Sequence, residues 1–418
     1  MTVVNLKFGA VDEVRFRPHR GVTNEVATMA ANGEAKVYRT KHKGVIDADG
    51  HVLEDATLWE RYCEEKYRPY AVRLGTDERG YERLEVNGKP SKFIHHGVLG
   101  ILGAMGMLSR ENWRWDFRRK WGEVAAWGAV DAKERIQRLE AENLAAAIIY
   151  PTIGLGWECE CEDADVAQAM CRAYNRWIVE WCSGSGGRLV PVAHLSLMDP
   201  EASAREMERA VKDGCKGAWV GSFSHTRKPH GHPDHDPLFA KAQELDIPLG
   251  IHPTVSPLWA HPGLYARNYT GGQLFFENVV GTDAARQALT SFIQHATFDK
   301  FPKLKIVMLE SGAGWISYLL DRWDDVWKSH FGHTLAIKHR PSEYFRRNIY
   351  ISADPDEHSL PAMIQLCGED RFFWASDFPH PDHIGDYLEE LDEIAARLKP
   401  AARKKLLGDN VRQAYHLG

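Results

Sequence analysis

Eight short apolar runs recur along the chain after residue 43, and segments with helical periodicity separate many of them. Short apolar runs are typical of buried strands, and apolar residues at a spacing of three and four are typical of helices that cover a sheet. The runs are Gly44–Ile46 (continuing into Asp49), Ala145–Tyr150, Leu189–Leu197, Gly217–Val220, Pro248–Ile251, Leu304–Leu309, Ile349–Ser352 and Phe372–Ala375. The helical segments include Asp165–Cys182, Pro200–Lys212, Pro237–Leu245 and Ala284–His295. This alternation predicts an α/β fold of the (β/α)8 TIM-barrel type. A doubly wound sheet is the alternative, but no glycine-rich loop follows the first run.

Two regions fall outside the eightfold pattern. We therefore expect an N-terminal extension over residues 1–43 and a barrel over 44–418, with a long insertion over 52–144 near the pocket. The insertion is rich in tryptophan and basic residues: Trp113, Trp115, Trp121, Trp127, Arg110, Arg114, Arg118, Arg119 and Lys120. These residues would either roof the pocket and bind an anionic or aromatic substrate, or pack at a subunit contact.

Composition narrows the classes of partner. The 418 residues carry a net charge of −6 and no basic tract, which argues against nucleic acid and against an anionic membrane surface. The N-terminus lacks the pattern of a signal peptide and no run reaches the length of a membrane span, so we expect a cytoplasmic protein. The seven cysteines are an odd, scattered set, typical of reduced thiols. The close pair Cys159 and Cys161 is interpreted as part of an ordinary loop and not as a metal site.

Ligand-type residues lie where four of the predicted strands end. Asp49 and His51 alternate at the end of the first strand, so both side chains should point to the same place. His252 ends the fifth strand and Glu310 ends the sixth. Asp377 and His380 follow the eighth. Because barrel chemistry is built where the strands end, these residues predict a metal site at the C-terminal mouth.

The same strand ends resemble the amidohydrolase superfamily. The resemblance rests on Asp47–His51, Ile251–Pro253, Phe301–Val307 and Ala375–His380, in this order along the chain. It is closest to the amidohydrolase-2 branch, which includes metal-dependent hydrolases and the non-oxidative decarboxylases of aminocarboxymuconate semialdehyde and hydroxybenzoates.

The resemblance implies a set of metal ligands. The first-strand pair falls on Asp49 and His51, the fifth-strand histidine on His252 and the eighth-strand aspartate on Asp377. The chain departs from the family in two places: the usual His-x-His is Asp49-Gly50-His51, and the histidine common at the end of the sixth strand is Glu310. We predict that Glu310 is a ligand or contacts metal-bound water, and that Asp377, Glu310 and His380 are the catalytic residues.

A carboxylate-rich site with two imidazoles suits Zn²⁺, Mn²⁺ or Fe²⁺, and its carboxylates leave either one or two ions open. The leading hypothesis is hydrolysis or non-oxidative decarboxylation of a small, anionic substrate. The alternative is a non-haem iron monooxygenase, with a dinuclear Fe or Mn/Fe centre, on the same barrel. A non-catalytic partner subunit is the third reading, and the apparently complete ligand set argues against it. We expect a homo-oligomer, with a hetero-oligomer as the alternative.

Overall fold

The computed structural model describes residues 37–108, 118–255, 257–260, 279–280 and 282–418. Eight parallel strands form one sheet in the order β1-β5-β6-β7-β8-β9-β10-β11. Their bounds are β1 Val45–Val52, β5 Leu144–Pro151, β6 Leu189–His194, β7 Gly217–Gly221, β8 Pro248–His252, β9 Lys305–Met308, β10 Ile349–Ala353 and β11 Phe372–Trp374. Each contains most of one predicted apolar run, so the prediction of a (β/α)8 barrel is confirmed.

The barrel closes between β1 and the residues that follow β11. The Asp377 amide donates to the Asp49 carbonyl at 2.9 Å, and the His51 amide donates to the Phe378 carbonyl at 2.6 Å. Both Asp47 carboxylate oxygens accept from Ser376, one from its amide and one from its hydroxyl. These bonds place two of the predicted ligand segments side by side across the closing seam.

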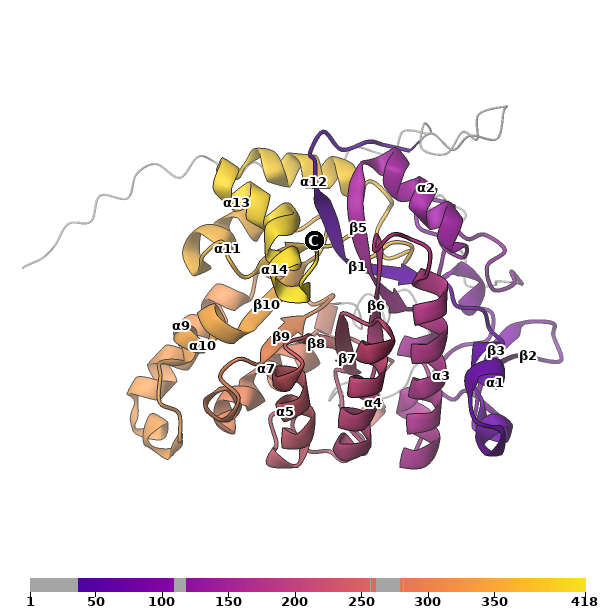
Figure 1. The fold of residues 1–418 in the computed structure, drawn as a ribbon, viewed down its shortest axis with the longest axis horizontal. Coiled ribbons are helices and arrows are strands. Elements are labelled where there is room, and N and C mark those ends of the chain that lie inside the picture. Colours follow the sequence, from indigo (N-terminus) through magenta and orange to yellow (C-terminus); the bar gives the residue numbers. More distant parts are fainter. Residues whose placement is uncertain (1–36, 109–117, 256, 261–278, 281) are drawn as a thin grey trace, which may run out of the picture. The chain divides into compact units, whose positions relative to one another are not determined.

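Helices lie on the outer side of the strands, as α3, α4 and α5 show in Figure 1. The longer described helices are α2 Ala132–Glu142, α3 Ala164–Cys182, α4 Pro200–Asp213, α5 Asp236–Glu244, α7 Asp283–Gln294, α9 Ile316–Lys328, α10 Pro341–Asn348, α11 Leu360–Cys367 and α12 Tyr387–Ala396. The shorter ones are α1 Leu58–Tyr62, α8 Thr297–Lys300, α13 Pro400–Lys404 and α14 Asn410–Tyr415. Asp131, Asp163 and Asp199 cap α2, α3 and α4 by accepting backbone amides of the first turn. The four helical segments predicted from periodicity are confirmed as α3, α4, α5 and α7.

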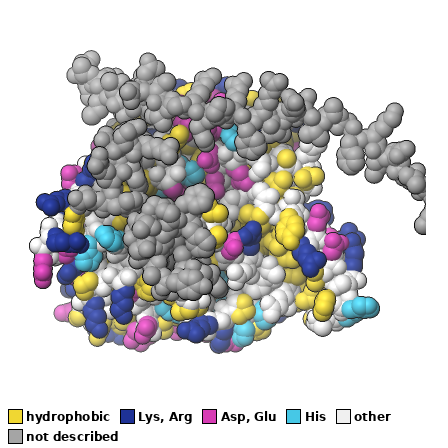
Figure 2. Space-filling view, turned by 180° about the vertical axis from the view of Figure 1, so that it is seen from behind, with side chains coloured by type: hydrophobic (Ala, Val, Ile, Leu, Met, Phe, Trp, Pro, Cys, Tyr) yellow, Lys and Arg dark blue, Asp and Glu magenta, His cyan; other side chains and the backbone are white. Residues whose placement is uncertain are grey.

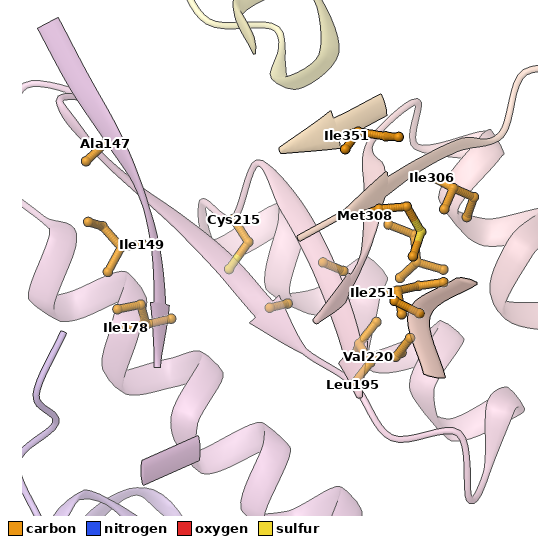
Figure 3. Close-up of a cluster of buried hydrophobic side chains, with 14 of the residues drawn as sticks. Ala147, Ile149, Ile178, Leu195, Cys215, Val220, Ile251, Ile306, Met308 and Ile351 are labelled. Carbon is orange, nitrogen blue, oxygen red and sulfur yellow. The ribbon is translucent and has the colours of Figure 1, made fainter. Parts of the chain in front are cut away.

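The strands alternate their side chains between two buried clusters. Ala147 and Ile149 of β5 point outward into the layer between strands and helices, which Figure 3 shows together with Ile178 of α3. Ile148 and Tyr150, the alternate residues of β5, point into the barrel. This period of two is what a strand buried on both faces requires.

The C-terminal helix α14 contributes to the interior cluster. Tyr415, which is 2% exposed, packs there, and its hydroxyl lies 3.0 Å from the hydroxyl of Tyr150. The two hydroxyl groups therefore form a hydrogen bond with each other inside an otherwise apolar cluster. A hydrogen-bonded hydroxyl is the usual arrangement for a buried tyrosine.

The insertion after β1 carries structure of its own. It contains α1, the crossover helix α2 and a small antiparallel sheet of β2 Arg73–Thr76, β3 Glu82–Val86 and β4 Lys89–Pro90. Part of it lies at the catalytic end of the barrel: the Met105 amide donates to the Pro379 carbonyl, and the Trp121 indole donates to the Glu54 carbonyl. Arg118 contacts the ring of Tyr81. Arg110, Trp113, Arg114 and Trp115 lie outside the described residues, so a role for them at the pocket stays a prediction.

Charges are mixed on the surface. Figure 2 shows Lys and Arg side chains interspersed with Asp and Glu over the described part of the face that it displays. Among the described residues, no helix has both the length and the apolar character needed to cross a bilayer. All seven cysteines are buried free thiols, as the odd and scattered set predicts.

A buried histidine after β7 makes the stability of the fold dependent on pH. His230 is 5% exposed and its Nε2 donates to the carbonyl of Gly221 at 2.8 Å. Burial lowers the pKa of His230 to about 4, against an ordinary value of 6.5. Its contribution to stability is therefore complete above pH 6.5 and is lost as the pH falls through 4, because the unfolded chain takes up the proton first.

We predict that His230→Gln, which keeps a donor for the Gly221 carbonyl, flattens this dependence. Between pH 6.5 and 4 the unfolding free energy of the wild type should fall by up to about 3 kcal/mol more than that of the variant. Urea denaturation across this pH range measures the difference. Parallel curves for the two proteins would contradict the assignment.

Candidate metal centre

A bulge in β1 decides which of its acidic side chains face the barrel mouth. The pairing of β1 with β5 slips between Asp47 and Gly50, so one extra residue is accommodated there. Asp49 and His51 reach the same place, with His51 Nε2 at 3.5 Å from Asp49 Oδ1. Asp47 lies two residues before Asp49, so strict alternation would point it to the same place. Its carboxylate instead accepts hydrogen bonds from Ser376 across the seam.

Gly50 lies between the two inward-facing residues and has no space for a side chain. A Cβ at this position would lie 2.6 Å from the Asp47 carboxylate, which is below contact distance. The glycine therefore lets Asp47 fold back towards Ser376 while Asp49 and His51 face the mouth.

The two predicted ligand histidines are oriented alike. His51 Nδ1 lies 2.7 Å from the carbonyl of Pro151, and His252 Nδ1 lies 2.7 Å from the carbonyl of Pro253. Because a carbonyl can only accept, each Nδ1 carries the proton. Each Nε2 is therefore free to act as a ligand, which is how second contacts orient metal-binding histidines.

The acidic residues at the ends of β9 and β11 have unusual backbones. Glu310 has φ of 39° and Asp377 has φ of 54°, both in the left-handed region that residues other than glycine rarely adopt. Such conformations cost about 1–3 kcal/mol each and cluster at functional sites. They bring Asp377 Oδ1 to 3.1 Å from His51 Nε2 and Glu310 Oε2 to 3.5 Å from His252 Nε2.

Four buried polar atoms at this mouth have no hydrogen-bond partner among the described residues. They are Asp49 Oδ1, His51 Nε2, His252 Nε2 and Asp377 Oδ2. Unpartnered buried polar atoms are costly and rare, so four around one point require an explanation. Two nitrogen and two oxygen atoms from the ends of three strands, β1, β8 and β11, fit a divalent ion that satisfies them together.

Asp49 and the other carboxylates differ in their electrostatics. Burial opposes the ionisation of Asp49, but His252 and His51 lower its pKa to about 2. Burial raises the pKa of Asp377 well above its usual range, and the charges of Asp382 and Asp49 raise it further. Burial also raises the pKa of Glu310 well above its usual range, and the charges of Asp377 and Asp382 raise it further. A cation at this mouth would supply the positive charge that these carboxyl groups lack.

His380 supports the site from one side. Its ring lies 4.0 Å from that of His51, its Nδ1 lies 3.1 Å from Asp377 Oδ1 and its Nε2 lies 3.1 Å from the Thr152 hydroxyl. Burial lowers the pKa of His380 well below its usual range, and the nearby His51 and His252 lower it further. A neutral His380 that donates to Asp377 and accepts from Thr152 therefore fits every contact.

The structure brings together every residue predicted for the site. His51, Glu310, Asp377 and His380 form one group of ligand-type side chains, and Asp49, His51 and His252 form another that shares His51. His194 is not part of either group; its Nε2 pairs with Glu158 at 3.2 Å. Cys159 and Cys161 are also outside these groups.

The sequence analysis missed three acidic or imidazole groups beside the mouth. Asp382 and His383 follow His380 closely and form a third ligand-type group with Asp377. Asp354, which follows β10, interacts electrostatically with Asp382 and Asp49. The density of ligand types in Asp377–His383 was the available signal, whereas nothing in the sequence around Asp354 marks it.

Known proteins are similar to this chain in sequence and in fold. The amidohydrolase family model matches residues 160–417, a range that begins after Asp49 and His51. Gamma-resorcylate decarboxylase of Polaromonas sp. (strain JS666 / ATCC BAA-500) is 28% identical over 270 residues, which cover 61% of this chain and 78% of that protein.

Two solved structures show the same fold. An amidohydrolase from Mycobacterium avium subsp. paratuberculosis K-10 superposes with a TM-score of 0.76 at 21% identity, over 90% of this chain and 98% of that one. A dihydroxybenzoic acid decarboxylase from Polaromonas sp. JS666, solved with bound manganese and the inhibitor 2-nitroresorcinol, superposes with a TM-score of 0.59 at 18% identity, over 90% and 98%.

We predict that Asp49→Asn weakens metal binding. Asparagine keeps the shape of the side chain but removes the negative charge between His51 and His252, so the affinity for Mn²⁺ should fall by at least about 100-fold. Titration of chelator-treated protein with Mn²⁺ measures the affinity, and circular dichroism checks that the variant is folded. Unchanged Mn²⁺ affinity in a folded variant would show that Asp49 is not a ligand.

Proposed function

The chain belongs to the amidohydrolase family, and on this premise we propose that it is a metal-dependent carboxy-lyase that removes CO2 from a small aromatic acid. The observation that carries the proposal is the set of four unpartnered, buried donor atoms at the ends of β1, β8 and β11. We propose Asp49, His51, His252 and Asp377 as the ligands, and manganese, which the Polaromonas decarboxylase binds, as the first metal to test.

A divalent ion held by these residues would supply a Lewis acid that binds the carboxylate and a neighbouring oxygen of the substrate. The Nε2 atoms of His51 and His252 and the carboxylate of Asp49 would fix its position. His380 would hold Asp377 through the contact between its Nδ1 and Asp377 Oδ1. The carbonyls of Pro151 and Pro253 keep the two ligand imidazoles in the binding tautomer.

Non-oxidative decarboxylation also needs a proton. The bond between the ring carbon and the carboxylate breaks, CO2 leaves, and the electron pair left on the ring carbon takes up a proton. Glu310 is suited to hold that proton, because burial and the charges of Asp377 and Asp382 raise its pKa well above the usual range. Its side chain is 26% exposed, so it is also the proposed site residue most open to a substrate. Glu310 would take the role of the histidine that is common at this position in the family.

An oxygenase is the second candidate function, and Glu310 is again the observation that favours it. Its carboxylate, 3.5 Å from His252 Nε2, adds a third acidic group to a site with two histidines. Such a donor set suits iron and a second ion as well as a single Mn²⁺. The two functions differ in their need for O2, which the assay below includes.

The proposed activity is tested with 2,6-dihydroxybenzoate and related hydroxybenzoates. The Mn²⁺-loaded protein should release CO2 under strictly anaerobic conditions, and Asp49→Asn should abolish the release. Substrate consumption only in the presence of O2, with iron but not manganese, would replace this proposal by the oxygenase. No turnover of any aromatic acid with either metal would contradict both.

We predict that Glu310→Gln loses turnover or metal while keeping its fold. Glutamine preserves the shape of the side chain but can neither deliver a proton nor carry a negative charge, so kcat should fall by about 10²–10⁴-fold. Steady-state kinetics and metal analysis on the same preparation measure the two effects. Full activity and full metal content would reduce Glu310 to a structural residue of the segment after β9.

A further inference from the structure

We propose that Arg138 of α2 is a positioning residue for the metal centre and acts on Asp377 through the ring of Phe378. The guanidinium carbon of Arg138 lies 3.9 Å from the centroid of this ring, and that of Arg135 lies 4.4 Å from it. Phe378 follows Asp377 directly in the chain. The inference rests on the proposed metal dependence, because Asp377 is one of the proposed ligands.

Phe378 is buried at the seam that closes the barrel. Its carbonyl accepts the amide of His51 at 2.6 Å, and the amide of Asp377 donates to the carbonyl of Asp49 at 2.9 Å. Asp377 also has a left-handed backbone, a conformation that persists only where the surrounding structure holds it. A shift of the Phe378 ring would therefore move the backbone that carries one proposed ligand and is bonded to two others.

The two arginines reach the ring from one face of α2. They are three residues apart, which places them on the same side of the helix. A guanidinium over an aromatic face is attracted by the quadrupole of the ring, more strongly where water is excluded. Burial lowers the pKa of Arg135 to about 10, so this side chain is charged at neutral pH. Burial opposes the charge of Arg138 as well, but Glu142 and Tyr387 raise its pKa above the ordinary value.

Arg138 is held against the ring through all three of its guanidinium nitrogens. Its Nε pairs with Glu142 Oε1 at 2.7 Å, and its terminal nitrogens donate to the Trp127 carbonyl at 2.9 Å and to the Tyr387 hydroxyl at 3.0 Å. The Tyr387 hydroxyl in turn donates to Glu142 Oε1 at 2.5 Å. A lysine could not make these contacts and stack on the ring at once, because it lacks the planar, forked donor group.

Of these contacts, only Phe378 adjoins a proposed ligand in the chain. Arg135 differs, because it donates to the carbonyl of His51 and its loss would disturb a ligand strand directly. A cavity of about 10 Å³, lined by Arg138, Phe378 and Ser376 among others, lies beside the ring. Loss of the Arg138 guanidinium would enlarge this cavity, so the ring would gain room to shift.

The experiment is a Mn²⁺ titration of the full-length, chelator-treated protein, with free Mn²⁺ measured by EPR. Arg138→Met keeps an unbranched apolar stem but loses the guanidinium, so the affinity for Mn²⁺ should fall by about 10–100-fold. Arg138→Lys keeps the charge without the planar group and should show a loss of the same order.

Arg188→Met is the matched control. Arg188 also donates to two backbone carbonyls and pairs with a glutamate, but it does so where β5 begins, at the opposite end of the barrel from the proposed centre. This variant should lose stability in a thermal melt and bind Mn²⁺ as tightly as the wild type.

A double-mutant cycle tests the route through the ring. In a Phe378→Leu background, Arg138→Met should change the Mn²⁺ affinity by less than about 2-fold, because the group through which it acts is already gone. Equal effects of Arg138→Met in the two backgrounds would overturn the route.

Hydrogen exchange of the metal-free protein gives a readout that does not depend on the metal. The amides of His51 and Asp377, which form the seam, should exchange about 10-fold faster in Arg138→Met and at the wild-type rate in Arg188→Met. A wild type that binds no Mn²⁺ would contradict the proposed function, and the exchange rates would then decide the positioning role by themselves.

Unchanged Mn²⁺ affinity in a folded Arg138→Met protein, or an equal loss in Arg188→Met, would overturn the inference. Circular dichroism shows whether each variant is folded, and Arg138→Lys keeps the test decisive if Arg138→Met is not. A wild type that binds Mn²⁺ without decarboxylating any aromatic acid would contradict the proposed function and leave the positioning role standing.

Discussion

The seam that closes the barrel is the interaction on which the site depends. Two backbone hydrogen bonds join β1 to the segment after β11: the Asp377 amide donates to the Asp49 carbonyl, and the His51 amide donates to the Phe378 carbonyl. The residues that close the barrel are thus the proposed ligands or their immediate neighbours. Because the hydrogen bonds fix the backbones, the side chains of Asp49, His51 and Asp377 meet without any flexible loop between them, which is how a rigid scaffold preorganises a site.

Several groups that do not touch the centre hold this seam. Asp47 binds the amide and hydroxyl of Ser376, one residue before Asp377. Arg135 of α2 is 1% exposed and donates to the carbonyls of His51 and Gly128. Glu54 accepts the amides of residues 152–154, next to the Pro151 carbonyl that orients His51. A left-handed backbone such as that of Asp377 persists where the surrounding structure holds it, and the bonds from Ser376 to Asp47 hold the residue before it.

Electrostatics separates the site from an ordinary acidic surface. Glu310, Asp354 and Asp377 lie near one another, and none of them forms an ion pair with a lysine or arginine of the described residues. Burial and the neighbouring acids raise the pKa of all three carboxyl groups, so they resist ionisation in the absence of a cation. A cation satisfies the unpartnered donors and the charge at once.

The sequence by itself determined the barrel and the ligand-type residues that lie at its mouth. Strands that are apolar on both faces and amphipathic helices are local patterns that the sequence records. Each strand of a barrel ends at its mouth, so residues that follow a predicted strand are expected there. The residues predicted in this way are Asp49, His51, His252, Glu310, Asp377 and His380. Only the tertiary structure decided that Asp47 turns away at a bulge, that Glu310 and Asp377 adopt left-handed backbones, and that Asp354, Asp382 and His383 join the acidic mouth. The physical reason is that these outcomes depend on contacts between residues hundreds of positions apart, such as Asp47 with Ser376, which no periodicity along the chain records.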